Sequence, residues 1–270
     1  MASSLQPPRS RFAPPRLDDQ DLPAPPPEAP RRSFDLDPPA RWRWLGLGIA
    51  LAWPLTLVLP SMFSWVLCAI PHEMGHATVG CLLGHPSAPA ISLRGEAWTG
   101  IAAQRGWLVW TMALLALGGG ALCLRRRRTV AAIALGATAL LLPALALSRA
   151  ADVAITLGGH LGELAFATYC FALAWTGGRT DTPQERTAAA MAGAIVQARN
   201  VQLCFGLMTS PAARAHYAGN GSLGIKNDYL VLAQDLWHCR LETVAALMLL
   251  VALLPLPIGV LAGWLRTRAD

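Results

Sequence analysis

The sequence has few charged residues and almost no lysine. Only 14% of its 270 residues are charged, and Lys226 is the one lysine among 22 basic residues. A typical soluble domain has about 25% charged residues. Because 54% of the residues are hydrophobic and the mean hydropathy is +0.40, the composition predicts a membrane protein. The alanine- and arginine-rich, lysine-poor composition, without an organelle signal, favours a multi-pass protein of a bacterial inner membrane.

Paired cysteines and nucleic-acid motifs are also missing. The six cysteines are scattered singly and include no C-x-x-C pair, which argues against a disulfide framework and a thiolate zinc site. The arginine block 125–128 lies between apolar runs, so we interpret it as a topology signal on a short loop. No nucleic-acid partner is expected. The N-terminus also shows no cleavable signal peptide, because no apolar core appears before about Leu45.

The chain divides into a tail and a membrane domain. Residues 1–42 contain eleven of the 21 prolines, and such a segment buries too little apolar surface to offset its ordering entropy. We expect it to be disordered. The run Arg41-Trp42-Arg43-Trp44 is typical of an interfacial anchor and leads into the transmembrane domain, residues 43–270.

Long apolar runs predict an all-α polytopic membrane protein, a bundle of about five to six transmembrane helices. Residues 187–208 are a weaker candidate for a transmembrane helix, because Arg199 and Asn200 lie in the middle of the segment. We favour an amphipathic helix there. The expected apolar segments are 45–84, 107–124, 129–149, 153–176 and 241–264.

The first apolar run is too long for one span. Forty helical residues would extend about 60 Å, twice the hydrocarbon thickness of about 30 Å. We therefore predict a helical hairpin that turns near Pro60, with Pro54 as the other candidate for the break. In this hairpin His72 would lie close to the membrane midplane.

The motif H-E-x-x-H stands in the second half of this run, as AIPHEMGHATVG. His72 and His76 are four residues apart, so on a helix they share one face and can bind one metal ion. Glu73 follows the first ligand and can act as general base on metal-activated water. The alternatives are a chance match and a pair of histidines hydrogen-bonded within a helix bundle. Ionisable residues inside a membrane are costly and usually functional, which favours the metal site.

A catalytic zinc needs a third protein ligand, and the segment GGHLGELAF (158–166) offers two candidates. His160 and Glu163 lie one turn apart, and either could bind the metal while the other orients a ligand. The alternative is a structural Glu–His pair. Gly158, Gly159 and Gly162 would let another helix approach closely.

Two acidic residues in KNDYLVLAQDLWH, Asp228 and Asp235, lie on a predicted amphipathic helix. Asn227 or Asp228 could cap its start, and we favour that role for Asp228 over a role as ligand. The alternating segment ISLRGEAW (91–98) predicts a short strand, whose edge could bind an extended peptide beside the metal. An ordinary connecting loop is the equal alternative.

The segment H72-E73-M74-G75-H76, its small neighbours and the polytopic frame resemble the M50-type (site-2 protease-like) intramembrane zinc metalloproteases. The resemblance implies that His72 and His76 are ligands, that Glu73 is the general base, and that the reaction is peptide-bond hydrolysis. That family usually supplies its third ligand from an Asp-Gly motif, and the chain has no Asp-Gly pair. Either the GGHLGE segment replaces it or the chain is a divergent branch.

The sequence thus predicts a zinc-dependent membrane-embedded endopeptidase with Zn²⁺ as cofactor and membrane proteins or peptides as substrates. A membrane protein that binds or transports a metal without hydrolysis is the first alternative, and an inactive protease-like scaffold is the second. Glu73 distinguishes them, since only hydrolysis requires a base beside the ligands.

Overall fold

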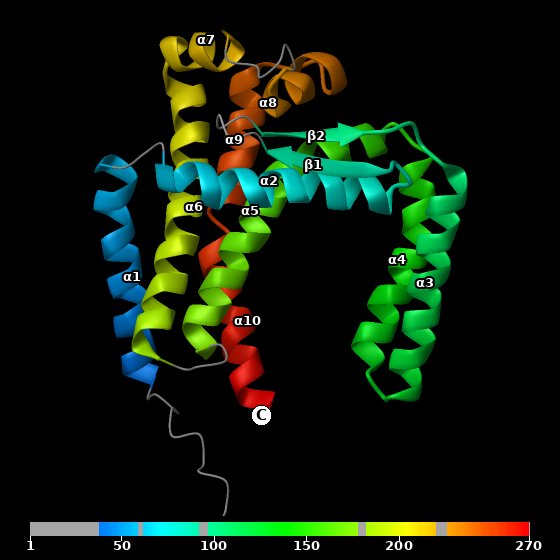
Figure 1. The fold of residues 1–270 in the computed structure, drawn as a ribbon, viewed down its shortest axis with the longest axis horizontal. Helices are drawn as coiled ribbons and strands as arrows, with labels where there is room; N and C mark the ends of the chain where they lie inside the picture. The colour runs from blue at the N-terminus through cyan, green and yellow to red at the C-terminus, as the bar shows by residue number, and fades with distance from the viewer. Residues whose placement is uncertain (1–37, 59–61, 92–96, 178–181, 220–225, 270) are drawn as a thin grey trace, which may run out of the picture. The chain divides into compact units, whose positions relative to one another are not determined.

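The structure is a computed structural model that describes residues 38–58, 62–91, 97–177, 182–219 and 226–269. This part of the chain is mostly helical, as predicted (Figure 1). The predicted tail, residues 1–42, lies almost entirely outside the described residues. Helix α1 (Pro38–Val58) begins slightly before the predicted start of the membrane domain.

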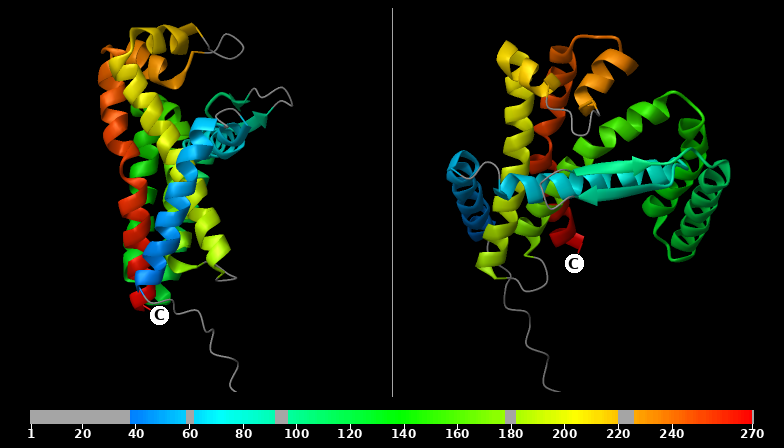
Figure 2. Two further views of the ribbon diagram at one scale, coloured as in Figure 1. Left: turned by 90° about the vertical axis from the view of Figure 1, so that its left-hand side faces the viewer. Right: turned by 45° about the horizontal axis from the view of Figure 1, so that its top comes forward.

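The first apolar run is divided between two helices. Helix α1 ends at Val58 and α2 (Met62–Leu82) begins shortly after it, while the predicted turn at Pro60 lies outside the described residues. The two helices pack mainly on different partners, unlike the hairpin that we predicted. Helix α1 packs on α6 (Pro183–Thr209), whereas α2 runs crosswise to both and packs on α5 (Ala150–Thr176) (Figures 1 and 2).

Helices α5 and α6 form the centre of the helical core. Their contact is lined by small residues, because an added Cβ on Gly193 would lie 3.0 Å from the carbonyl oxygen of Ala167. The cluster around this contact includes Phe171 and Trp175 of α5 and Leu45 of α1, all buried. The two helices thus approach closely at Gly193, and large side chains pack around this point.

Three stretches of the described residues are long and apolar enough to cross a membrane: Gly106–Arg125, Thr129–Ala146 and Leu241–Arg268. The first two are helices α3 and α4, which pack on each other. The third contains α9 (Leu241–Ala252) and α10 (Pro255–Ala269), and α10 packs on α5. A membrane protein is therefore supported, while the predicted count of five to six spans stays a prediction.

A β-hairpin lies along α2 (Figure 2, right). Strand β1 (Ser87–Ile91) pairs antiparallel with β2 (Ala97–Ile101), and Pro89 is opposite Thr99. The predicted strand, 91–98, coincides only with the end of β1 and the start of β2, and residues 92–96 lie outside the described part. The extended backbone thus begins earlier than the sequence pattern predicted.

The segment between α6 and α9 contains short helices: α7 (Pro211–Gly219), α8 (Asp228–Leu230) and the π-helix η2 (Val231–Leu236). The predicted helix start at Asp228 is confirmed. Helices with π geometry are rare and are often found at functional sites.

Candidate metal centre

Glycines bring α2 and α5 into direct backbone contact. An added Cβ on Gly75 would lie 2.1 Å from the carbonyl oxygen of Gly158, and one on Gly162 would lie 2.8 Å from the Cα of Gly75. No side chain fits at either place. The predicted role of the α5 glycines in close helix approach is confirmed, and it sets the face of α2 that carries the histidines against α5.

The Nδ1 atoms of the two α2 histidines, which we call their outer nitrogens, lie beside acceptor oxygens on α5. Nδ1 of His76 lies 2.7 Å from the carbonyl oxygen of Ile155, and Nδ1 of His72 lies 3.2 Å from Oε1 of Glu163. A carbonyl or carboxylate oxygen can only accept, so both Nδ1 atoms carry the proton. Each neutral imidazole then presents the lone pair of its Nε2 atom on the opposite side.

Asp228 lies beside His72 and His76 as a third polar group. A capping role, and not this position, was expected for it from the sequence. Its Oδ2 atom lies 3.1 Å from Nε2 of His72 and 3.1 Å from Nε2 of His76, and the two Nε2 atoms are 3.2 Å apart. The capping role expected for Asp228 is wrong. Asn227, the other candidate, occupies the N-cap position of α8, without a side-chain cap hydrogen bond. The carboxylate of Asp228 instead faces α2.

The residues that follow Asp228 fix its position. Tyr229, Leu232 and Ala233 are buried in a cluster with Cys204 of α6 and residues of α9. Just before it, Asn227 donates through Nδ2 to the carbonyl oxygen of Tyr217. Burial of the apolar side chains of α8 and η2 thus holds the carboxylate over the histidines, although it is 152 residues away from His76 in the chain.

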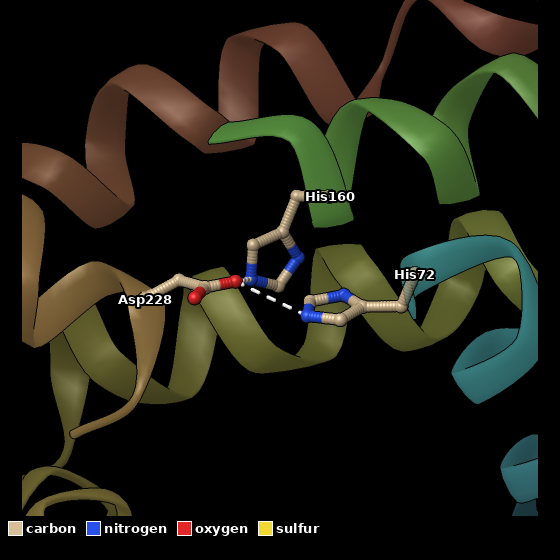
Figure 3. A group of neighbouring side chains, drawn as sticks. All are labelled: His72, His160 and Asp228. Carbon is tan, nitrogen blue, oxygen red and sulfur yellow. Dashed lines mark ion pairs between the residues drawn. The ribbon is translucent and has the colours of Figure 1, made fainter. Parts of the chain in front are cut away.

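When both imidazoles are neutral, three acceptor atoms lie 3.1–3.2 Å from one another, and this arrangement suits a cation between them. Zinc binds nitrogen and oxygen ligands at about 2.1 Å, which places the ligands of a tetrahedral site about 3.4 Å apart. The observed spacing is close to this value. Three residues, His72, His160 and Asp228, also form a group that could hold a metal ion (Figure 3).

His160 and Glu163 both lie beside this group, but they face different atoms of it. Nε2 of His160 is 3.8 Å from Oδ2 of Asp228, farther than either α2 histidine. Glu163 contacts the outer nitrogens: its Oε2 lies 3.3 Å from Nδ1 of His160 and its Oε1 contacts His72. Glu163 therefore orients two imidazoles and does not reach the three clustered atoms.

Asn200 joins the same network. Its Oδ1 lies 3.3 Å from Nδ1 of His160, its Nδ2 donates to the carbonyl oxygen of Val196, and it is buried. The sequence signal was a polar residue in the middle of an apolar helix, which we interpreted as amphipathic character. An amide in this place can accept from the imidazole, and this fixes the orientation of His160.

Glu73 lines a pocket of about 350 Å³ together with His72, His76 and Asp228. Its side chain is buried, and the hydroxyl of Thr99 donates to its Oε2 at 2.6 Å. Thr99 belongs to β2, so the hairpin fixes the carboxylate. No sequence pattern predicts this contact, since it depends on the register of the hairpin against α2.

The charge of Asp228 suits a cation ligand. Burial raises its pKa, but when the histidines carry protons, hydrogen bonds from His72 and His76 and charge on His72 and His160 lower it more, so the pKa lies well below its usual range. Asp228 is therefore ionised at neutral pH and supplies one negative charge to the group.

Gly159 leaves the space in which an ion would sit. A Cβ at this position would lie 2.4 Å from Nε2 of His76 and 2.6 Å from Nε2 of His72. We expect Gly159→Ala to weaken zinc binding at least about tenfold, because both rings are held by their outer hydrogen bonds. Gly136→Ala is the control, since a Cβ there meets nothing within 4 Å. Zinc titration of both folded variants checks the expectation, and equal affinities would contradict it.

Comparison of the chain with protein-family models, with curated proteins and with solved structures found no match. The fold and the site by themselves define a helical protein with membrane-type helices and a histidine–aspartate group that could hold a metal ion.

Proposed function

We propose that the protein is a zinc-dependent, membrane-embedded endopeptidase. The observation that carries the proposal is the convergence of Nε2 of His72, Nε2 of His76 and Oδ2 of Asp228, with Glu73 in the same pocket. Three protein ligands with an open fourth position are the pattern of catalytic zinc. A carboxylate that directly follows the first histidine ligand is the pattern of a hydrolytic zinc site.

The donor set favours zinc over harder cations. Magnesium and calcium prefer sites made of oxygen atoms, whereas two imidazoles and one carboxylate suit zinc. The resemblance to the M50-type proteases agrees with this set, because that family takes its third ligand from a later aspartate. Asp228 takes that place here, with Tyr229 where the family motif has glycine.

Zinc, when bound, supplies a Lewis acid and lowers the pKa of water to about 7. The protein's own groups do the rest. Glu73, held by the hydroxyl of Thr99, accepts a proton from the attacking water and passes it to the leaving amine. The Nδ1 atom of His160 faces Glu163 and Asn200, and its Nε2 atom faces Asp228. Protonated at both nitrogens, this ring would donate through Nε2 to the charge that develops on the substrate carbonyl oxygen.

The β-hairpin supports a peptide as substrate. Ala97, Trp98 and Thr99 of β2 line the same pocket as the histidines. A substrate in extended form can add to this two-stranded sheet through main-chain hydrogen bonds, which brings its backbone beside the metal. A substrate within the membrane would reach the site after local unwinding of its helix, because a helix has its backbone groups already paired.

The test uses purified protein in detergent and a mixture of peptides derived from membrane proteins. We expect internal cleavages by the wild type with zinc, detected as new N-termini by mass spectrometry, and none by Glu73→Gln or after chelation. If the wild type with zinc produces no cleavage that depends on Glu73, the proposal is wrong.

One observation favours a second function, metal binding without hydrolysis. A small movement of His160, now 3.8 Å from Asp228, would give four protein ligands and close the site. A closed site lacks a position for water. The two functions predict different zinc affinities for His160→Ala. A hydrolytic site with three ligands should keep its zinc in this variant, whereas a closed site with four ligands should bind zinc more weakly.

Thr99→Val tests the positioning of Glu73. Loss of a hydrogen bond to a charged group costs about 1.5–3 kcal/mol, so we expect kcat to fall by about 10- to 100-fold with zinc content unchanged. Thr111→Val is the control, because its hydroxyl donates to the carbonyl oxygen of Trp107 on an exposed part of α3. Steady-state kinetics on the best-cleaved peptide measure the effect. Equal kcat values in the two variants would remove Thr99 from the site.

A further inference from the structure

A second cavity lies at the other end of α5 from the metal centre. It has a volume of about 860 Å³ and is formed by the start of α1, the end of α5 and one face of α10. Both the start of α1 and the C-terminus lie at this end in Figure 1. Trp175, which lines it, is fifteen residues after His160 on α5 and so about 22 Å along the helix. The two sites are separate.

The lining of the cavity changes from apolar to polar along α10. Its α10 residues recur at one face of the helix, and together they extend about 18 Å along the axis, at 1.5 Å per residue. The apolar end is formed by Leu256, Pro257 and Val260, and the polar end by Thr267 and Arg268. One leaflet of a bilayer has a hydrocarbon depth of about 15 Å, half of the total. The groove thus matches an acyl chain with its headgroup at the end of the helix.

The polar end is cationic and aromatic. Arg41 and Arg268 line it, and no acidic side chain is among the described residues of its lining. The guanidinium of Arg268 lies 3.8 Å from the ring centroid of Trp264, which holds it at the rim. Tryptophan and arginine at the end of a membrane span are typical of the level of lipid headgroups.

A buried donor lies in the wall of the cavity. Trp175 is only 5% exposed, and its Nε1 has no hydrogen-bond partner among the described residues. The ring is fixed by an edge contact with Trp42, at 4.9 Å between centroids, and by the backbone of Gly263. A buried indole N–H without a partner is costly, so a shift of the ring that brought it to an ester or phosphate oxygen of a bound lipid would be favourable.

We propose that this cavity is a binding site for one anionic phospholipid. The phosphate lies at the guanidinium group of Arg268, and an acyl chain lies along the face of α10 from Leu261 toward Leu256. The charge of the rim selects an anionic headgroup over a zwitterionic one. Because α10 belongs to a candidate membrane span, lipid is present at this face at high local concentration.

The test is native mass spectrometry of the full chain, released from detergent and titrated with phosphatidylglycerol or phosphatidylcholine. We expect one phosphatidylglycerol to bind tightly, and phosphatidylcholine to bind at least about tenfold more weakly. Arg268→Gln should lose at least about tenfold in affinity for phosphatidylglycerol, and Trp264→Leu should lose affinity as well. Arg266→Gln is the matched control, with the same loss of charge in the same turn at a residue outside the cavity.

Three outcomes would overturn the proposal. Equal losses in Arg266→Gln and Arg268→Gln would mean that only net charge matters. Equal binding of both lipids would mean an apolar groove without headgroup recognition. Binding that appears only after deletion of residues 1–37 would make the N-terminal segment the occupant. None of these results bears on the metal centre, whose zinc content is measured separately.

Discussion

Replacement of Asp228 by alanine is expected to remove the metal from the purified protein. Asp228 supplies one of the three atoms that we propose as ligands, which lie 3.1–3.2 Å apart, and among these three it is the anionic one. Mutation of residues that only orient a ligand costs about 10- to 100-fold in metal affinity, so loss of a ligand should cost more than about 100-fold. We expect zinc per chain, measured by mass spectrometry of the metal, to fall from near one to near zero.

Asp235→Ala is the matched control for this substitution. Asp235 lies in the following π-helix, where it pairs with Lys226 at 2.9 Å at the surface. A surface pair of this kind contributes about 1 kcal/mol or less, so zinc content should not change. If Asp228→Ala keeps its zinc while His160→Ala loses it, the third ligand is His160, one of the two candidates that the sequence offered.

Replacement of Glu73 by glutamine is expected to abolish peptide hydrolysis and leave the zinc in place. Glutamine keeps the shape of the side chain, and its amide can still pair with the hydroxyl of Thr99, but it cannot accept a proton from water. General-base catalysis contributes about 10²- to 10⁴-fold, so kcat should fall by that factor. Steady-state kinetics on the best-cleaved peptide measure the fall in kcat, and zinc analysis of the same preparation measures the retained metal.

Glu185→Gln serves as the control, because Glu185 lies in the exposed first turn of α6, away from the pocket. It should have wild-type kcat and zinc content. Wild-type activity in Glu73→Gln would show that Glu73 is not the base. Loss of zinc from Glu73→Gln would instead show that this carboxylate is part of the metal site.

The parts of the fold that follow from local sequence were predicted well. Long apolar runs predicted α3, α4 and the C-terminal span. Of the two prolines proposed as the break in the first run, Pro54 is wrong because it lies inside α1, and Pro60 lies outside the described residues, between the end of α1 and the start of α2. The direction of α2 could not be predicted, because it depends on the contact of Gly75 with Gly158 and Gly162 of α5. Such a contact between glycines far apart in the chain leaves no periodic pattern in either segment.

The proposed third ligand, Asp228, could not be predicted from local sequence either. His72 and His76 are found from spacing alone, because both lie on one helix. Asp228 looked like an ordinary helix start, since a carboxylate before an apolar run is a common cap. What distinguishes it is the burial of Tyr229, Leu232 and Ala233, which turns the carboxylate toward α2. That is a property of tertiary packing.

The most direct test of the metal centre is anomalous scattering at the zinc edge from crystals of the protein purified with zinc and without chelator. The account predicts one peak about 2.1 Å from Nε2 of His72, Nε2 of His76 and Oδ2 of Asp228, with a fourth position free for water. Absence of a peak between these atoms, or a peak on a different set of residues, would contradict it.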